Sequence, residues 1–285
     1  MKNRVIIILL SVVSICACTE NESFPSEATT VNAVLEGYTW HTGDMISLFD
    51  GGKNLLLTSF TEGEKACFEA ETLPNKALVV FPGNKSYELT NMDLEVSFTA
   101  KPRVIPEEKL GGIATAAYNG GDLSFAYVNS FLEFTVSRDD ISSLSFTSDA
   151  QHPISGDFIL SFKEDGSASL SATQSSGNTV TFDSEMLKGT YRLAVPKGSY
   201  SSITVKMTAS DGMIEKEITS VEAIPGKPVS LGIIDVDGDW VKTPLLEIID
   251  VSSSTAAFTW TTSNFEDPYE DTSVKWTAAI YSDAE

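Results

Sequence analysis

The sequence predicts an all-β protein made of consecutive β-sandwiches, and three observations lead to this fold class. Short segments rich in β-branched and aromatic residues recur along the chain, and several alternate apolar with polar residues. Turn signals containing Gly, Asn and Asp separate these segments. The 3.6-residue period of an amphipathic helix is nearly absent, apart from a weak pattern at residues 105–117. Short strands at such spacing are typical of β-sandwiches.

The clearest strand patterns follow one another along most of the chain. They lie at residues 45–49, 77–81, 94–98, 131–136 and 203–207. Some of them, such as residues 94–98 and 203–207, alternate apolar with polar residues, whereas residues 77–81 are continuously apolar. Because side chains of a strand point alternately to its two faces, the alternating segments are expected to have one buried and one solvated face.

The chain begins with a short apolar run that ends at Cys18. Lys2 and Arg4 precede the run, Val5 to Val13 form it, and small residues stand directly before the cysteine. About 20 apolar residues are needed to span a bilayer, and this run is shorter. The order of charges, apolar residues and small residues is typical of a signal peptide, so residues 1–17 are expected to be a signal and 18–33 a polar tether.

This segment resembles the lipobox of bacterial lipoproteins, in which the cysteine becomes the lipidated first residue of the mature chain. The resemblance implies that Cys18 is lipidated and attaches the protein to the outer membrane. Glu20 and Glu22 look like an acidic signal for export to the outer face of that membrane, and a simple polar tether is the alternative reading.

Two changes of pattern divide the remaining chain. The turn residues 119–122 separate one set of strands from the next, which predicts a first sandwich at 34–119 and a second at 120–234. Acidic residues 235–243 are expected to be a linker. Residues 244–285 resemble the opening strands of a fibronectin type III module, with Trp260 in its core, and imply a truncated immunoglobulin-like β-sandwich.

The charge and the cysteines limit the kinds of function. Forty acidic against nineteen basic residues give a net charge of −21, which repels phosphate backbones and excludes nucleic acid as a partner. Cys16 is lost with the signal and Cys18 is committed to lipid, so Cys67 has no partner for a disulfide. We expect Cys67 to be a buried, unreactive thiol.

The sequence carries no recognisable catalytic or cofactor motif. His41 and His152 lie outside metal and nucleophile motifs, and HExxH, Walker, nucleophile-elbow and Cys-x-x-Cys patterns are missing. A triad or a carboxylate pair assembled from distant residues is not excluded by sequence. The prediction is a non-enzymatic protein without a cofactor.

One acidic segment is a candidate ion site. The alternate carboxylates of Asp235, Asp237 and Asp239 can converge on calcium. The segment departs from an EF-hand loop, because Gly238 comes too early and the twelfth position is Leu246. An acidic linker between domains is the alternative interpretation.

Aromatic residues provide the candidates for ligand binding. Trp40 and Trp260 stand at strand spacing and are expected in cores. Tyr200 lies in a predicted turn and Trp240 in the predicted linker, so these two are the candidates for stacking on a sugar ring.

Residues 38–234 resemble the fimbrillin-like lipoproteins, the family of type V pilins and their relatives in Gram-negative anaerobes. The matching segments are Trp40-His41-Thr42-Gly43-Asp44-Met45-Ile46-Ser47-Leu48, residues 77–82, residues 123–134, residues 191–196 and residues 224–231. The resemblance implies two tandem transthyretin-like β-sandwiches. Locally, Gly43-Asp44 is expected to form a tight turn that directs Ile46 and Leu48 inward.

One departure from the family bears on function. Its polymerising pilins lose an N-terminal strand by cleavage after arginine, which opens a groove for a donor strand from the next subunit. Between Cys18 and Asp93 this chain has no arginine. We therefore expect a surface-exposed fimbrial anchor, accessory subunit or adhesin, with fimbrial subunits or a host or glycan ligand as partners. The alternatives are a glycan-binding lipoprotein of a polysaccharide uptake system, or the non-catalytic stem of a longer enzyme.

Overall fold

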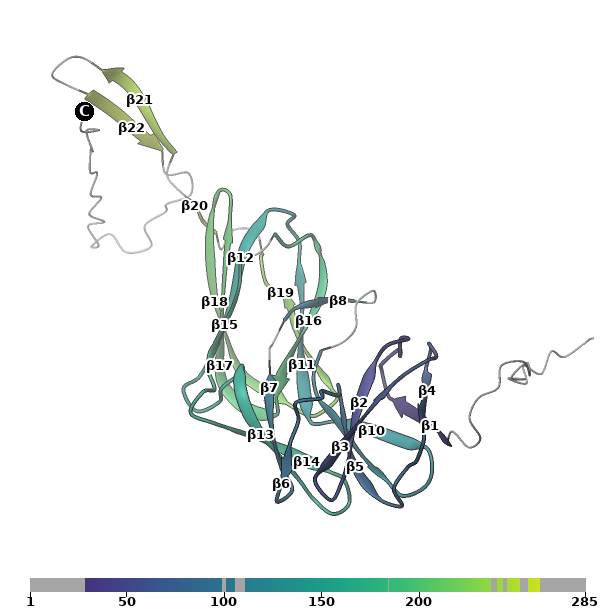
Figure 1. The fold of residues 1–285 in the computed structure, drawn as a ribbon. Helices are drawn as coiled ribbons and strands as arrows, with labels where there is room; N and C mark the ends of the chain where they lie inside the picture. The colour runs from purple at the N-terminus through teal and green to yellow at the C-terminus, as the bar shows by residue number, and fades with distance from the viewer. Residues whose placement is uncertain are drawn as a thin grey trace, which may run out of the picture.

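A computed structural model of the chain describes residues 29–98, 101–105, 111–183, 185–236, 240–242, 245–251 and 256–261. All regular structure in these residues is β, which confirms the all-β class (Figure 1). The weak helical pattern at 105–117 is wrong, because its described second half contains the buried strand β9 (Ala114–Tyr118). A membrane-spanning helix is not found among the described residues.

The first unit is a single curled sheet. Its strand order is β3 (Lys53–Thr58), β2 (Met45–Asp50), β5 (Ala77–Phe81), β9, β10 (Leu123–Tyr127), β1 (Thr29–Leu35) and β4 (Lys65–Ala70). The two edges meet where Ser59, just after β3, pairs with Phe68 of β4. Trp40, Ile46 and Leu48 are fully buried inside, as the sequence predicts.

Strand β1 corrects the expected tether. The tether was expected to reach residue 33, yet the first strand begins at Thr29. Val31 and Ala33 are buried, and β1 pairs antiparallel with β4 and parallel with β10. The inward face of this strand begins with one valine and one alanine, so its apolar pattern is too weak to stand out beside the polar residues before it.

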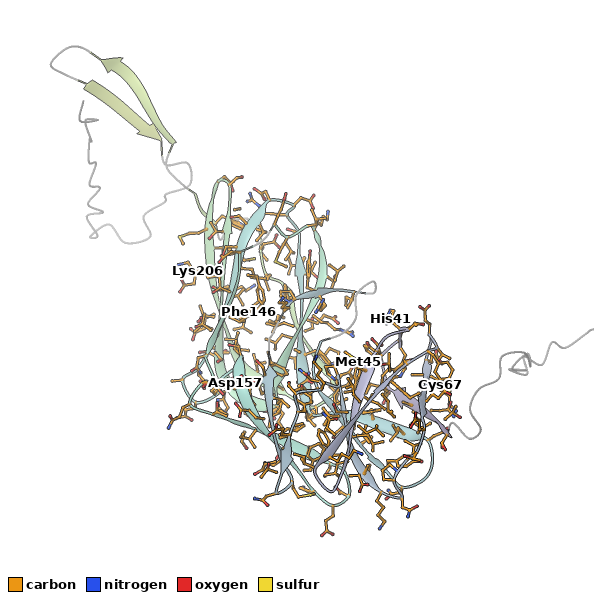
Figure 2. The ribbon with its side chains drawn as sticks, in the orientation of Figure 1. His41, Met45, Cys67, Phe146, Asp157 and Lys206 are labelled. Carbon is orange, nitrogen blue, oxygen red and sulfur yellow. The ribbon has the colours of Figure 1, made fainter. Side chains whose placement is uncertain are left out.

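The second unit contains three sheets around one core. Their strand orders are β19 (Pro228–Ile233), β11 (Asn129–Val136), β16 (Gly189–Pro196) and β8 (Arg103–Val104); then β15 (Thr179–Phe182), β12 (Ile141–Ser148), β17 (Gly198–Ala209), β18 (Gly212–Ala223) and β20 (Val241–Lys242); then β14 (Ala168–Ala172), β13 (Gly156–Phe162), β7 (Asp93–Phe98) and β6 (Leu89–Thr90). Phe146 lies inside the unit, whereas Lys206 points outward (Figure 2). The alternation of buried and exposed residues along β17 and β12 confirms sandwich packing.

The expected boundary at residue 119 is wrong, because the two units exchange strands within the chain. Each unit includes at least one strand from the other side of that residue. Strands β6, β7 and β8 precede it in sequence but belong to the second unit, where Val96 of β7 lies opposite Phe158 of β13. Strand β10 follows it but belongs to the first sheet. Residues 119–122 are a hairpin turn between β9 and β10, and a hairpin turn and a domain boundary have the same Gly- and Asn-rich signal.

A separate hairpin follows the second unit. Strands β21 (Leu245–Val251) and β22 (Ala256–Thr261) pair antiparallel, with Leu246 opposite Trp260. They coincide with the first two strands expected of the third module. Residues 262–285 lie outside the described residues, so the type of this module stays a prediction.

Candidate functional site

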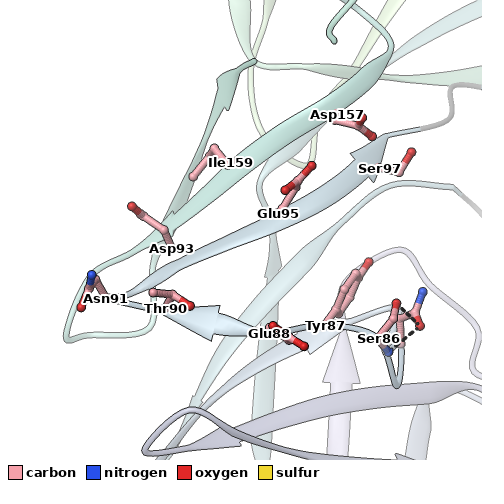
Figure 3. A pocket seen from close by; sticks show the side chains of 11 residues that line it. Ser86, Tyr87, Glu88, Thr90, Asn91, Asp93, Glu95, Ser97, Asp157 and Ile159 are labelled. Atoms are coloured by element: carbon pink, nitrogen blue, oxygen red, sulfur yellow. Dashed lines mark hydrogen bonds between the residues drawn. The ribbon is translucent and has the colours of Figure 1, made fainter. Parts of the chain in front are cut away.

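A groove of about 680 Å³ lies where the loop after β5 faces the outer surface of β6, β7 and β13 (Figure 3). Polar side chains dominate its lining. The lining residues are the carboxylates Glu88, Asp93, Glu95 and Asp157, the amides Asn84 and Asn91, the hydroxyls Ser86, Thr90 and Ser97, and the larger side chains Tyr87 and Ile159.

The floor of the groove follows from the alternation of β7. Leu94, Val96 and Phe98 are buried in the core of the second unit, which leaves Asp93, Glu95 and Ser97 on the opposite face. This alternation is visible in the sequence.

Strand β13 extends the same polar face. Its buried residues Phe158 and Leu160 leave Asp157 and Ile159 outward. In the antiparallel register Asp157 lies opposite Ser97 and Ile159 opposite Glu95. The side chains of the two strands are therefore direct neighbours on one surface, as Figure 3 shows.

The other side of the groove is a loop held in place by the first unit. The Asn84 backbone N–H donates to Ser47 Oγ at 2.9 Å. Asn54 Nδ2 donates to the carbonyl oxygens of Asn84 and Tyr87 at 2.8 and 3.2 Å. The Asn84 side chain in turn accepts from the backbone N–H of Ser86 at 3.0 Å. These bonds fix the loop before any ligand binds, which reduces the entropy cost of binding.

The groove offers oxygen acceptors and no positively charged side chain. Burial raises the pKa of Tyr87, so its phenol stays neutral and is able to donate a hydrogen bond. The lining contains no Lys or Arg, and in the described part of the chain its four carboxylates form no ion pair. Such a surface suits a ligand that donates several hydrogen bonds and disfavours an anionic one.

Metal binding has no support within the described ranges. They contain no group of three or more His, Cys, Asp or Glu side chains placed to hold an ion. Asp235 is fully buried, and its carboxylate accepts from the N–H groups of Ser137 and Arg138 at 2.8 to 2.9 Å and from Ser137 Oγ at 3.0 Å. Both oxygens of Asp235 thus accept hydrogen bonds from the protein itself, and the calcium role of this residue stays a prediction. Asp237 and Asp239 lie outside the described residues.

The predicted stacking aromatics are also corrected. Tyr200 is 1% exposed, and its hydroxyl donates to the Pro196 carbonyl oxygen at 2.6 Å. Trp240 is 7% exposed, with the Arg138 guanidinium 4.5 Å from its ring centroid. Neither ring presents a free face to solvent. The prediction failed because a turn or linker position in the sequence does not determine whether a side chain is buried.

The remaining candidates are placed as follows. His41 lies 3.8 Å from Asp44, and His152 Nδ1 lies 2.7 Å from Asp149 Oδ1. Cys18 lies outside the described residues, so its lipidation stays a prediction.

The groove itself was not predicted. The alternation of Asp93, Glu95 and Ser97 marks a polar strand face in the sequence. Its neighbour Asp157 comes from a distant strand, and only the register between β7 and β13 brings the two together.

Comparison with known proteins finds solved structures with a similar fold. No protein-family model and no curated protein matches the chain. A solved structure of a candidate cell adhesion protein from Bacteroides uniformis matches with a TM-score of 0.51 and 13% identity, over 84% of this chain and 98% of that one. A second, from Bacteroides ovatus, matches with a TM-score of 0.51 and 6% identity, over 82% and 96%. At such identities the likeness establishes fold alone, and the chain has the fold of these two Bacteroides proteins over nearly their whole length.

Proposed function

We propose that this protein is a non-enzymatic adhesion protein of the bacterial cell surface that binds a neutral, hydroxyl-rich glycan in the groove between the β5–β6 loop and strands β7 and β13. The observation that supports adhesion is the fold, shared with two candidate cell adhesion proteins over almost their entire chains. The similarity extends across both units rather than one sandwich, since it covers more than four-fifths of this chain.

The groove supports the choice of a glycan. Carboxylate and amide oxygens accept hydrogen bonds from sugar hydroxyls, and the neutral phenol of Tyr87 supplies a donor and an aromatic face. Sulfated or sialylated glycans would place negative charge against Glu88, Glu95 and Asp157, with no lining cation to offset it. The preferred ligand is therefore uncharged.

The sequence adds a mode of attachment to this proposal. Lipid on Cys18 would anchor the protein in the outer membrane, and Glu20 and Glu22 would direct it to the outer face. In that position the protein serves as a fimbrial anchor, an accessory subunit or a free adhesin. The neighbouring genes separate these roles from glycan uptake, since fimbrial genes favour the first and a glycan transporter pair the second. Palmitate labelling that persists in Cys18→Ala would contradict the anchor.

Glycan-array binding of the chain from residue 19 tests the ligand. We expect binding to neutral glycans and little to sulfated or sialylated ones. Tyr87→Ala, Glu95→Gln and Asp157→Asn should each weaken binding about tenfold, the effect of losing one or two good hydrogen bonds. Glu69→Gln is the matched control, because Glu69 is exposed on β4 and does not line the groove. Equal binding by all four variants, or no binding to any glycan, would overturn the proposal.

A further inference from the structure

The acidic segment after the second unit is held at its beginning by Asp235. This residue is fully buried, and its carboxylate accepts from the backbone N–H groups of Ser137 and Arg138 at the end of β11. Ile234, just before it, donates its N–H to the Thr135 carbonyl oxygen at 3.1 Å. The chain is therefore fixed to the turn between β11 and β12 as it leaves β19.

The segment is held again at Trp240 by one arginine. The Arg138 guanidinium lies 4.5 Å from the centroid of the Trp240 ring, which is a cation–π contact. The same group donates Nε and one terminal nitrogen to the two carboxylate oxygens of Asp140, at 2.8 and 2.7 Å. It also donates to Asp211 Oδ1 at 2.6 Å. Arg138 thus joins the β11–β12 turn, the β17–β18 hairpin and the chain at residue 240.

A short strand completes the attachment. Directly after Trp240, Val241 and Lys242 form β20, which pairs antiparallel with Met213 and Gly212 at the start of β18. The sheet of the second unit therefore continues into the segment that the sequence predicts to be a linker. Ser210, in the adjoining hairpin turn, donates to Asp140 at 2.7 Å and closes the network around Arg138.

We infer that Arg138, Asp140, Asp211, Asp235, Trp240 and β20 form a clasp that locks the chain to the tip of the second unit. The chain beyond Lys242 then leaves from an ordered strand in a fixed direction instead of from a flexible linker. A fixed exit sets the spacing between the two units and any segment that follows. The glycan groove uses none of these residues, so the clasp stands or falls independently of the proposed function.

Limited proteolysis of the full chain from residue 19 tests the clasp. Trypsin cuts after lysine, and a protease needs an extended, unpaired segment, so pairing of β20 should protect the bond after Lys242. We expect mass spectrometry to show cleavage there at least tenfold faster in Arg138→Ala and in Trp240→Ala than in the wild type. Hydrogen exchange at residues 212–213 and 241–242 should accelerate in the same variants.

Arg192→Ala is the matched control, because it removes the Arg192–Glu133 ion pair of the same unit, at 2.9 Å, without touching the clasp. Its cleavage rate after Lys242 should stay within twofold of the wild type. Asp211→Asn is the substitute variant if Arg138→Ala does not fold, because Asp211 is more exposed than Arg138. It weakens the clasp and should raise the rate of cleavage after Lys242 severalfold. Cleavage of the wild type as fast as a free peptide of residues 238–246, or equal rates in the clasp variants and the control, would overturn the inference.

Discussion

The backbone of Gly83 lies directly against the backbone of Ile46 in β2. A Cβ on residue 83 would overlap the Ile46 carbonyl carbon and the Ser47 nitrogen. The Gly83 N–H also donates to the Met45 carbonyl oxygen at 2.6 Å. Only glycine permits such an approach, and this contact sets the position of the loop that carries Tyr87 to the groove.

Replacing Gly83 by alanine should therefore displace this loop. We expect Gly83→Ala to lower the free energy of unfolding by about 1 to 3 kcal/mol, the usual cost of inserting a methyl group into packed structure. Urea denaturation measures the change. Gly121→Ala is the control, because a Cβ there meets no atom within 4 Å. Equal midpoints for the two variants would mean that β2 and the loop separate easily.

The exchange of strands between the units predicts that neither folds alone. A fragment of residues 120–234 lacks β7 and exposes Phe158 and Leu160, each of which contributes about 1.5 to 3 kcal/mol when buried. A fragment of residues 34–119 lacks most of β1 and all of β10. We expect both to give poorly dispersed NMR spectra.

Mixing residues 29–119 with residues 120–242 supplies every strand of both units and should restore dispersed signals. The break then falls in the turn between β9 and β10, where the chain only needs to reverse. A well-dispersed spectrum for residues 120–234 alone would contradict the exchange.

The strands that sequence predicts well are those with a strong local pattern. Residues 77–81 coincide with β5, and residues 45–49 lie within β2, because their apolar side chains alternate or run continuously. The turn at Gly43 is also confirmed, with φ of 90° at Gly43 and both Ile46 and Leu48 buried. Such features depend on neighbouring residues, which a sequence states directly.

The features that sequence misses depend on distant residues. The local sequence of β7 does not identify β13 as its partner strand. That pairing joins the two units and brings Glu95 near Asp157. Trp240 likewise packs in the core of the second unit and contacts Arg138, a residue far away in sequence. The candidate site is therefore visible in sequence only as one polar strand face.

Ser220 is a further test of local backbone strain. It has φ of 59° in β18, at an irregularity between the pairs Tyr200–Val221 and Ser202–Thr219. A β-branched residue is penalised in this conformation, so Ser220→Val should destabilise the protein by about 1 to 2 kcal/mol. Ser220→Gly should be neutral or stabilising. Thermal denaturation compares the two, and equal stability of the Val and Gly variants would show that the irregularity relaxes.

The Asp149 carboxylate predicts how stability depends on acid. Burial alone would raise its pKa, but hydrogen bonds from His152, Ser201 and Gln151 outweigh burial and lower the pKa to about 2. A lowered folded-state pKa stabilises the protein above the unfolded value near 4, and this contribution is lost as the pH falls toward 2. Asp149→Asn should cost about 1 kcal/mol at pH 6 and almost nothing near pH 2. A cost that stays constant across this range in urea denaturation would contradict the assignment.

The position of β1 predicts that the natural chain does not form filaments after treatment with an arginine-specific protease. β1 pairs with β4 along residues 29–34 and with β10 along residues 33–35, and its inward residues lie in the core. The first arginine after Cys18 is Arg103, in β8 of the second unit, so cleavage there does not separate β1 from the strands that follow it. Electron microscopy of the treated protein should show single particles.

Glu36→Arg is the informative comparison, because Glu36 is exposed directly after β1 and its replacement creates a cleavage site there. Filaments from this variant alone would show that the natural chain does not polymerise because it lacks an arginine after β1. Filaments from the natural chain would make it a polymerising subunit and contradict the accessory role.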